Sequence, residues 1–318
     1  MKPMESTIAA EAQQSTQAGV DSTEVLARHS RSFRLASLFL PEDRREDAAL
    51  LYAVCRLVDD LADESDDPIA AVEQLDRLRA ELAGDADARP LIEKFRTMAK
   101  RRDLDLTHMS SLIDGVQSDL GEVRIETDDE LLRYCYRVAG TVGLMMCAVL
   151  GVEDPRGHRH AIDLGVAMQL TNICRDVRED AERHRVYLPA QRLEEAGLSQ
   201  QQLLDGDVDR QALGEVVGDL LDLADCYYES ADAGMHYIPV RARMAILVAS
   251  RVYRAIGVRL RRNRCDAMAG RTVVSRPEKT WWVMVAIAAW TIISLFGGGA
   301  SEHDRTLHRS IEDLSGVS

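Results

Sequence analysis

Residues 169–189 read QLTNICRDVREDAERHRVYLP, and the spacing of their polar side chains decides how the rest of the chain is interpreted. Gln169, Asn172, Asp176 and Asp180 follow one another at helical spacing, so they form one polar line on an otherwise apolar helix. Two carboxylates at i and i+4 oppose a helix by roughly 0.2–0.5 kcal/mol. The line therefore indicates either a solvated charged turn or a site where a cation lies between the carboxylates.

A second acidic stripe lies upstream, in LYAVCRLVDDLADE (51–64). Its members share one face of the expected helix: Tyr52, Arg56, Asp59, Asp60 and Asp63. The rest of that helix is apolar, so we expect it to be buried with its narrow acidic strip facing a cavity. One such pair of acids is a weak signal, but two pairs with neighbouring arginines favour a Mg²⁺ site that holds a diphosphate. The alternative is a buried network of ion pairs that only stabilises the bundle.

Composition restricts the classes of function. The chain has 318 residues, 46% of them hydrophobic and 29% charged, and a formal net charge of −14. Such an acidic chain is not expected to bind nucleic acid. None of the six cysteines forms a C-x-x-C pair, so we expect reduced core cysteines and neither disulfides nor zinc. His158 and His160, in the turn DPRGHRH, are not expected to bind a metal.

Helical periodicity dominates the chain, and no convincing strand run is present. The pattern predicts helices over residues 22–38, 43–64, 69–83, 89–101, 105–119, 128–150, 156–181, 210–236, 238–264 and 278–296. The segment 186–209 is expected to be a loop with one or two short helices. We predict one all-α domain over 22–299, between a flexible N-terminal tail (1–21) and a polar C-terminal tail (300–318). The N-terminus lacks the apolar stretch of a secretory signal, so a cytoplasmic protein is expected.

Residues 281–296 form the most apolar stretch of the chain. Its 16 residues are fewer than the roughly 20 that a membrane span needs. We therefore favour a buried final helix of the bundle, with membrane contact or insertion as the alternative.

Several motifs together resemble the phytoene/squalene synthase family. They are HSRSF (29–33), YAVCRLVDDLAD (52–63), YCYRVAGTVG (134–143), QLTNICRDVREDAERHRVYLP (169–189) and SRPEK (275–279). The resemblance covers about residues 22–296 and, within the family, is greatest to bacterial phytoene synthases. It implies a single isoprenoid-synthase-type helical bundle around a central active-site cavity. His184 is a departure, because many members have glycine at that position.

The resemblance also implies roles for individual residues. The residues that match the metal ligands are Asp59, Asp63, Asn172, Asp176 and Asp180. Those that match diphosphate-binding positions are Ser30, Ser32, Tyr52, Arg56, Gln169, Arg175, Arg185, Tyr253 and Arg271. Tyr134 matches a residue that faces the reacting carbons. The implied cofactor is Mg²⁺, with Mn²⁺ as an alternative, and the implied catalytic groups are the four metal aspartates and Tyr134.

The implied reaction is the head-to-head condensation of two geranylgeranyl diphosphates to phytoene through a cyclopropylcarbinyl diphosphate, with no need for NADPH. Squalene or dehydrosqualene synthesis from farnesyl diphosphate is one alternative, and a non-catalytic helical assembly factor is another. Small residues that we expect to set the pocket depth are Ala139, Gly143 and Ala167. Gly140 and Gly143 suggest either a prenyl chain or a neighbouring helix packed on bare backbone. Peripheral membrane attachment is expected for an enzyme with a hydrocarbon product, and downstream carotenoid enzymes are further candidate partners.

Overall fold

The computed structural model describes residues 37–63, 67–296 and 302–317 of the chain. Ser30 and Ser32 lie outside these residues, as does almost all of the helix expected over 22–38. The helices before the segment 183–189 are α4 (Glu42–Asp63), α5 (Pro68–Ala83), α6 (Pro90–Arg102), α7 (Thr107–Gln117), α8 (Asp128–Cys135), α9 (Thr141–Leu150) and α10 (Arg156–Glu182). Those after it are α11 (Ala190–Glu195), α12 (Gln200–Asp205), α13 (Arg210–Ala233), α14 (Val240–Arg262) and α15 (Arg276–Phe296).

The remaining elements are short. They are a π-helical turn η1 (Tyr136–Gly140), the 3₁₀ turns η2 (Gly234–Tyr237), η3 (Ala267–Ala269) and η4 (Arg305–Ile311), and the strands β1 (Val123–Arg124) and β2 (Arg185–Val186). The two strands pair in parallel and are the only strands of the described residues. The predicted all-α fold is confirmed. The helix expected over 128–150 is divided by η1, a type of insertion that often marks functional sites.

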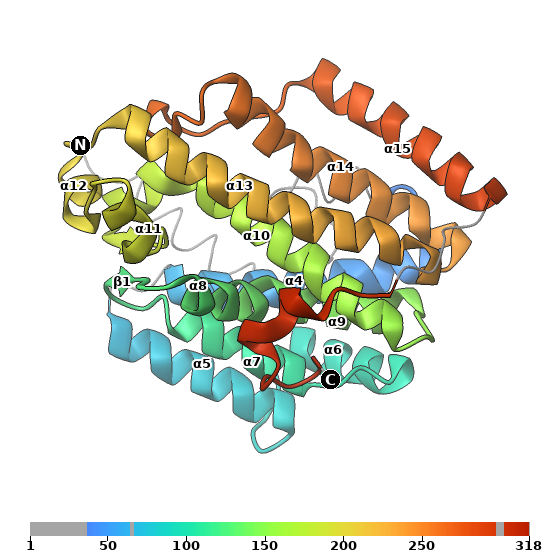
Figure 1. Cartoon of the computed structure of the whole chain (residues 1–318). Coiled ribbons are helices and arrows are strands. Elements are labelled where there is room, and N and C mark those ends of the chain that lie inside the picture. The colour runs from blue at the N-terminus through green and yellow to red at the C-terminus, as the bar shows by residue number, and fades with distance from the viewer. Residues whose placement is uncertain (1–36, 64–66, 297–301, 318) are drawn as a thin grey trace, which may run out of the picture.

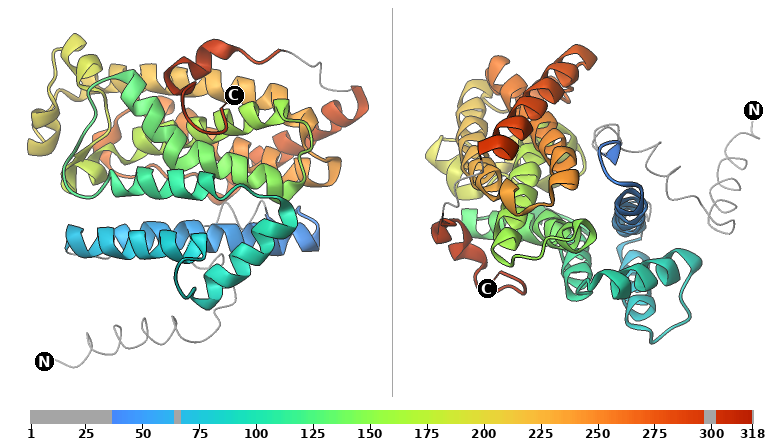
Figure 2. Two further views of the ribbon diagram at one scale, coloured as in Figure 1. Left: turned by 90° about the horizontal axis from the view of Figure 1, so that it is seen from below. Right: turned by 90° about the vertical axis from the view of Figure 1, so that its right-hand side faces the viewer.

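Helix α10 runs through the centre of the molecule and organises the other elements around it (Figure 1). It packs against α13, α9, η1 and α14. Helix α4 packs against α5, α6, α7 and α9, and it lies on the side of the bundle away from α13 (Figure 2). This arrangement brings the acidic stripe of α4 to the same region as the polar line of α10.

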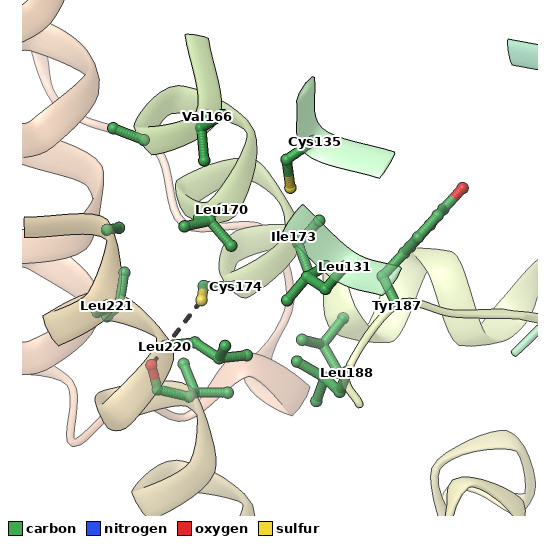
Figure 3. Close-up of a cluster of buried hydrophobic side chains, with 14 of the residues drawn as sticks. Leu131, Cys135, Val166, Leu170, Ile173, Cys174, Tyr187, Leu188, Leu220 and Leu221 are labelled. Carbon is green, nitrogen blue, oxygen red and sulfur yellow. Dashed lines mark hydrogen bonds between the residues drawn. The ribbon is translucent and has the colours of Figure 1, made fainter. Parts of the chain in front are cut away.

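The apolar side of α10 is held by one large hydrophobic cluster. Leu170, Ile173 and Cys174 pack there against Leu220 and Leu221 of α13, with Tyr187 at the edge (Figure 3). The Cys174 thiol points to the Val217 carbonyl oxygen, 3.8 Å away. All six cysteines are free, as expected, although Cys226 is exposed and not a core residue.

Helices α9 and α10 approach each other through bare backbone. A Cβ at Gly143 would lie 2.2 Å from the Ala161 carbonyl oxygen, and one at Gly165 would lie 2.3 Å from the Ala139 carbonyl oxygen. Gly140 packs against the Tyr136 ring and Ile162. Close helix packing therefore explains both glycines of the VAGTVG motif.

Two C-terminal expectations need correction. Among the described residues α15 packs mainly on α14, and Ala286 is its one buried hydrophobic residue. The helix is therefore not a buried final helix, because within the described residues Trp281, Met284, Ile292 and Leu295 of its other face are exposed. Residues 302–317, expected as a polar tail, pack on α8 and near α10, with Ile311 and Val317 buried.

Candidate active site

A polar pocket of about 350 Å³ lies between α4 and α10. Its lining contains both acid pairs that the sequence singled out. The predicted residues found in the lining are Asp59, Asp63, Asn172, Asp176, Asp180, Gln169, Arg56, Arg175, Arg185 and Tyr134. The helical spacing read from the sequence therefore places these groups around one common space.

The α4 side of the pocket presents Asp59 and Asp63. Burial raises the pKa of Asp59 to about 7, and the neighbouring carboxylate of Asp63 adds to the shift. Asp63 Oδ1 lies 3.3 Å from Nη1 of Arg185, which reaches across from the segment after α10. Arg56 is paired with Asp60 one turn further along, at 2.5 Å. Arg56 and Arg185 thus each pair with a carboxylate of α4.

The α10 side presents Asp176 and Asp180. Arg175 donates two hydrogen bonds to Asp176, and its Nε lies 2.7 Å from Oδ1. Arg271 Nε lies 3.4 Å from the same oxygen, so this residue contributes from the loop after α14. Burial raises the pKa of Asp180 to about 7, and the charge of Asp176 adds to it. Arginines therefore surround Asp176, while among the described residues no hydrogen bond or ion pair reaches Asp180.

The polar groups of this pocket fit a hard divalent cation. The Oδ1 atom of Asn172 is buried and accepts no hydrogen bond, which is costly unless a ligand occupies it. Asp59 and Asp180 resist ionisation in the absence of a counter-charge, and a bound cation would supply that charge. Carboxylate and amide oxygens are the ligands that Mg²⁺ prefers. Asp59, Asp63, Asn172, Asp176 and Asp180 would hold the ion.

A buried carboxylate that the sequence did not reveal completes the pocket. Asp119, just after α7, accepts hydrogen bonds from the hydroxyls of Tyr134 and Tyr187, both at 2.8 Å. The two tyrosine rings stack, with centroids 4.9 Å apart. Burial raises the pKa of Asp119 to about 6, although both hydroxyls oppose the shift. Its segment, GVQSDLGEV, reads as an ordinary polar helix end, so only the fold could identify it.

An apolar cavity of about 280 Å³ adjoins the polar pocket. The two share Val138, Gln169 and Asn172, so the two spaces meet at these side chains. Ala139 and Gly143 line the cavity as expected. Ala167 is buried but lies outside the lining, because it belongs to the core side of α10.

The other predicted site residues lie around these two spaces. Tyr253 of α14 lines the apolar cavity. Burial raises the pKa of Tyr52, and its charge interactions with Arg56 and Tyr253 place it beside both. Ser30 and Ser32 lie outside the described residues, so their predicted role stays a prediction.

Comparison with known proteins agrees with this geometry. The pattern of the squalene/phytoene synthase family matches residues 26–278 of the chain. The chain belongs to the squalene/phytoene synthase family. It is 38% identical to a 15-cis-phytoene synthase of Paracoccus sp. (strain N81106 / MBIC 01143), over 88% of this chain and 94% of that one. It is also 38% identical to a 15-cis-phytoene synthase of Enterobacter agglomerans, over 79% of this chain and 88% of that one.

A solved family member has the same fold. The crystal structure of a dehydrosqualene synthase in complex with ligand superimposes with a TM-score of 0.75 at 25% identity, and covers 89% of this chain and 98% of that one. His184, the departure from the family pattern, has a φ of 59°. This left-handed backbone favours glycine, which explains why many family members carry glycine there. Histidine keeps the same turn, and its carbonyl accepts a hydrogen bond from Arg124 Nη1 at 2.7 Å.

Proposed function

We propose that this protein is a prenyltransferase that joins two geranylgeranyl diphosphates head to head to form phytoene. The observation that carries the proposal is the junction of the two spaces at Val138, Gln169 and Asn172. One space is lined with carboxylates and arginines, and the other is apolar. A prenyl diphosphate has the same two parts, a charged head and a long hydrocarbon tail.

The polar pocket would bind and release the diphosphate groups. Arg56, Arg175 and Arg185 offer planar guanidinium donors, which suit phosphate oxygens. Once a ligand competes for Arg175 and Arg185, the carboxylates of Asp176 and Asp63 become free to bind a cation. A bound Mg²⁺ would neutralise the charge that develops on the leaving diphosphate.

The apolar cavity would protect the allylic cation that remains after diphosphate leaves. Water would quench such a cation, so the reaction needs a dry site. The cavity is lined by side chains such as Val142, Met146, Leu164 and Met168, which exclude water. Tyr134, held by Asp119 at the boundary, would orient its hydroxyl toward the reacting end of the tail.

The proposed reaction balances without a reductant. One substrate loses diphosphate, the double bond of the other attacks the cation, and a proton is lost to give the cyclopropylcarbinyl diphosphate. This intermediate loses its own diphosphate, rearranges and releases a second proton, which gives phytoene. Squalene synthesis would instead end with hydride transfer from NADPH.

Product analysis tests the proposal directly. The purified protein would receive Mg²⁺ and either geranylgeranyl or farnesyl diphosphate, each with and without NADPH, and the lipid extract would be separated by chromatography. We expect phytoene from geranylgeranyl diphosphate without NADPH, and no product after removal of Mg²⁺ by a chelator. Faster turnover of farnesyl diphosphate, or squalene made only with NADPH, would contradict the choice of substrate.

The alternatives are distinguishable in the same assay. The solved relative named as a dehydrosqualene synthase makes a farnesyl-based product the second candidate. An assembly factor without activity is less consistent with the pocket, because both acid pairs and the nearby arginines are present. Mn²⁺ in place of Mg²⁺ would show whether the site accepts either ion.

We also propose that α15 attaches the enzyme to the membrane surface, because its hydrocarbon product dissolves in the interior of the bilayer. The exposed face of α15 carries Trp281, Met284, Ile292 and Leu295, which are 56–72% exposed. No helix of the described residues has the length and apolarity needed to cross a bilayer. Alkaline carbonate should therefore release the protein from membranes, and Trp281→Ser with Leu295→Ser should weaken its flotation with liposomes. Retention after the carbonate wash would indicate insertion instead.

A further inference from the structure

The end of the apolar cavity that lies away from the polar pocket is lined by the rings of His160 and Tyr237. Along α10 the lining runs from Asn172, beside the polar pocket, to His160 and Gly157. Twelve residues separate Asn172 from His160, which corresponds to roughly 18 Å of helix. Tyr237 lines the same end, and its ring stacks near that of His160 with centroids 5.9 Å apart. A prenyl tail that enters from the polar pocket would reach this pair of rings last.

The His160 ring is held in place from several directions. A Cβ at Gly234 would lie 2.1 Å from the His160 Cβ, so the η2 backbone packs directly on this residue. Its Nδ1 lies 3.1 Å from the Ser230 hydroxyl of α13. The ring of His303 meets it edge-on, with centroids 5.1 Å apart. His303 therefore supports, from behind, a ring that lines the cavity.

His303 belongs to the C-terminal segment (residues 302–317), which is anchored through Asp163 of α10. The Asp163 side chain is 0% exposed and accepts hydrogen bonds from Nε2 of His303 at 2.8 Å and of His308 at 2.7 Å. The Ser230 hydroxyl donates to it as well. Burial by itself would raise the pKa of Asp163, but the two histidine hydrogen bonds hold that pKa below its usual range.

The same cluster has the composition of a metal site, but its geometry favours hydrogen bonding. Ligand atoms of His160, Asp163 and His303 lie within 4.8 Å of one another. Both carboxylate oxygens of Asp163 are already taken by imidazole nitrogens at hydrogen-bond distance. The cluster is therefore an anchor for the C-terminal segment.

We propose that His303, docked on Asp163, is a positioning residue that fixes His160 at the far end of the cavity and so limits the length of the prenyl chain that the enzyme accepts. The inference rests on the proposed function. Without His303, the His160 ring loses its support and can turn into the space behind it, which lengthens the cavity. The enzyme should then accept a chain one isoprene unit longer.

The test is a competition between geranylgeranyl diphosphate and geranylfarnesyl diphosphate, which is one isoprene unit longer. We expect His160→Ala to shift the ratio of the two kcat/KM values toward the longer substrate on the order of tenfold. His303→Ala should shift the ratio in the same direction. The double variant should match His160→Ala alone, because both changes act on one ring.

A matched control separates positioning from general loosening of the segment. Asp313 anchors the same segment at the surface through Arg133, at 2.6 Å, and does not reach the cavity. Asp313→Ala should leave the ratio at the wild-type value even if it lowers the melting temperature. Ala161→Phe, which fills the same end of the cavity, should shift the preference the other way, toward farnesyl diphosphate.

The outcomes distinguish the two proposals. If the wild type makes no phytoene from geranylgeranyl diphosphate, the proposed function fails. If it does, and His303→Ala keeps the wild-type ratio or adds independently to His160→Ala, the positioning role of His303 is overturned. A ratio that changes when Zn²⁺ is added or chelated would also overturn it, because the cluster would then be a metal site.

Discussion

Asp163 and Asp180 lie on the same helix, α10, and both are largely shielded from solvent, yet the two carboxylates differ in their hydrogen bonds and in the direction of their pKa shifts. Asp163 accepts hydrogen bonds from Ser230, His303 and His308, and its pKa is below the usual range. For Asp180, burial raises the pKa to about 7, and among the described residues no hydrogen bond reaches its carboxylate. The first carboxylate is satisfied by the fold. The second would be compensated by a bound cation.

The difference separates structural from functional acids within one helix. A buried charge without partners is costly, so a chain keeps one only where a ligand will compensate for it. Asp59 on α4 shares this property with Asp180, and the two face the same pocket. Substitutions at the two kinds of site should therefore affect different measurements.

The largest effect is expected on catalysis. Asp176→Asn should lower kcat/KM on the order of 100- to 1000-fold, because it removes an electrostatic ligand from the centre of the pocket. Helix content from circular dichroism should stay near that of the wild type, and Asp59→Asn should behave in the same way. Near-full turnover in Mg²⁺ by either variant would mean that its carboxylate is not a metal ligand.

The next effect is expected on stability, at the other site. Asp163→Asn should lower the free energy of unfolding by about 3 kcal/mol, because the amide keeps one acceptor oxygen and leaves one of the two buried imidazoles without its partner. Urea denaturation measures the change, with Asp313→Asn as an exposed control. A loss below about 0.5 kcal/mol would show that the histidine cluster contributes little to the fold.

A third prediction concerns pH. Metal ligands must be deprotonated, and burial raises the pKa of Asp59 and of Asp180 to about 7 in the metal-free protein. Both groups hold protons at pH 6 and lose them by pH 8, so Mg²⁺ should bind more tightly at the higher pH. Titration calorimetry should find roughly a tenfold gain in affinity for each proton released. Affinity that does not change between these pH values would contradict the shifted pKa values.

The sequence predicted the acidic pocket well because helical spacing is a local property. Intervals of three and four residues place side chains on one face whatever the rest of the fold does, and the two stripes supplied every carboxylate of the pocket except Asp119. The short helices expected within 186–209 are also present, as α11 and α12. Family membership, expected from the motifs, is confirmed by the match over residues 26–278.

Contacts between distant segments could not be predicted in this way. Asp119 becomes part of the site only because Tyr134 and Tyr187 reach it from other elements. The sequence of the C-terminal segment suggests a polar tail. Its histidines, however, find their acceptor in Asp163 of α10, which lies 140 and 145 positions away along the chain. For α15, apolar composition predicted burial, but in the described part of the chain it packs mainly on α14 and leaves its other face exposed.

The smallest expected effect is a gain in stability at the functional site. Because the pKa of Asp180 is raised in the folded state from 3.8 to about 7, the folded protein holds this proton more tightly than the unfolded chain does. The stability that comes from this group is full below pH 4 and is lost as the pH rises through 7. Asp180→Asn removes the charge, so it should raise the free energy of unfolding of the metal-free protein by about 1–2 kcal/mol at pH 8, after allowance for solvent screening. It should have almost no effect at pH 4, and added Mg²⁺ should reverse the sign by stabilising only the wild type. Urea denaturation at both pH values, with and without Mg²⁺, measures all of these differences. A variant that is less stable than the wild type at pH 8 without metal would show that the Asp180 carboxylate has partners within the fold, as that of Asp163 does.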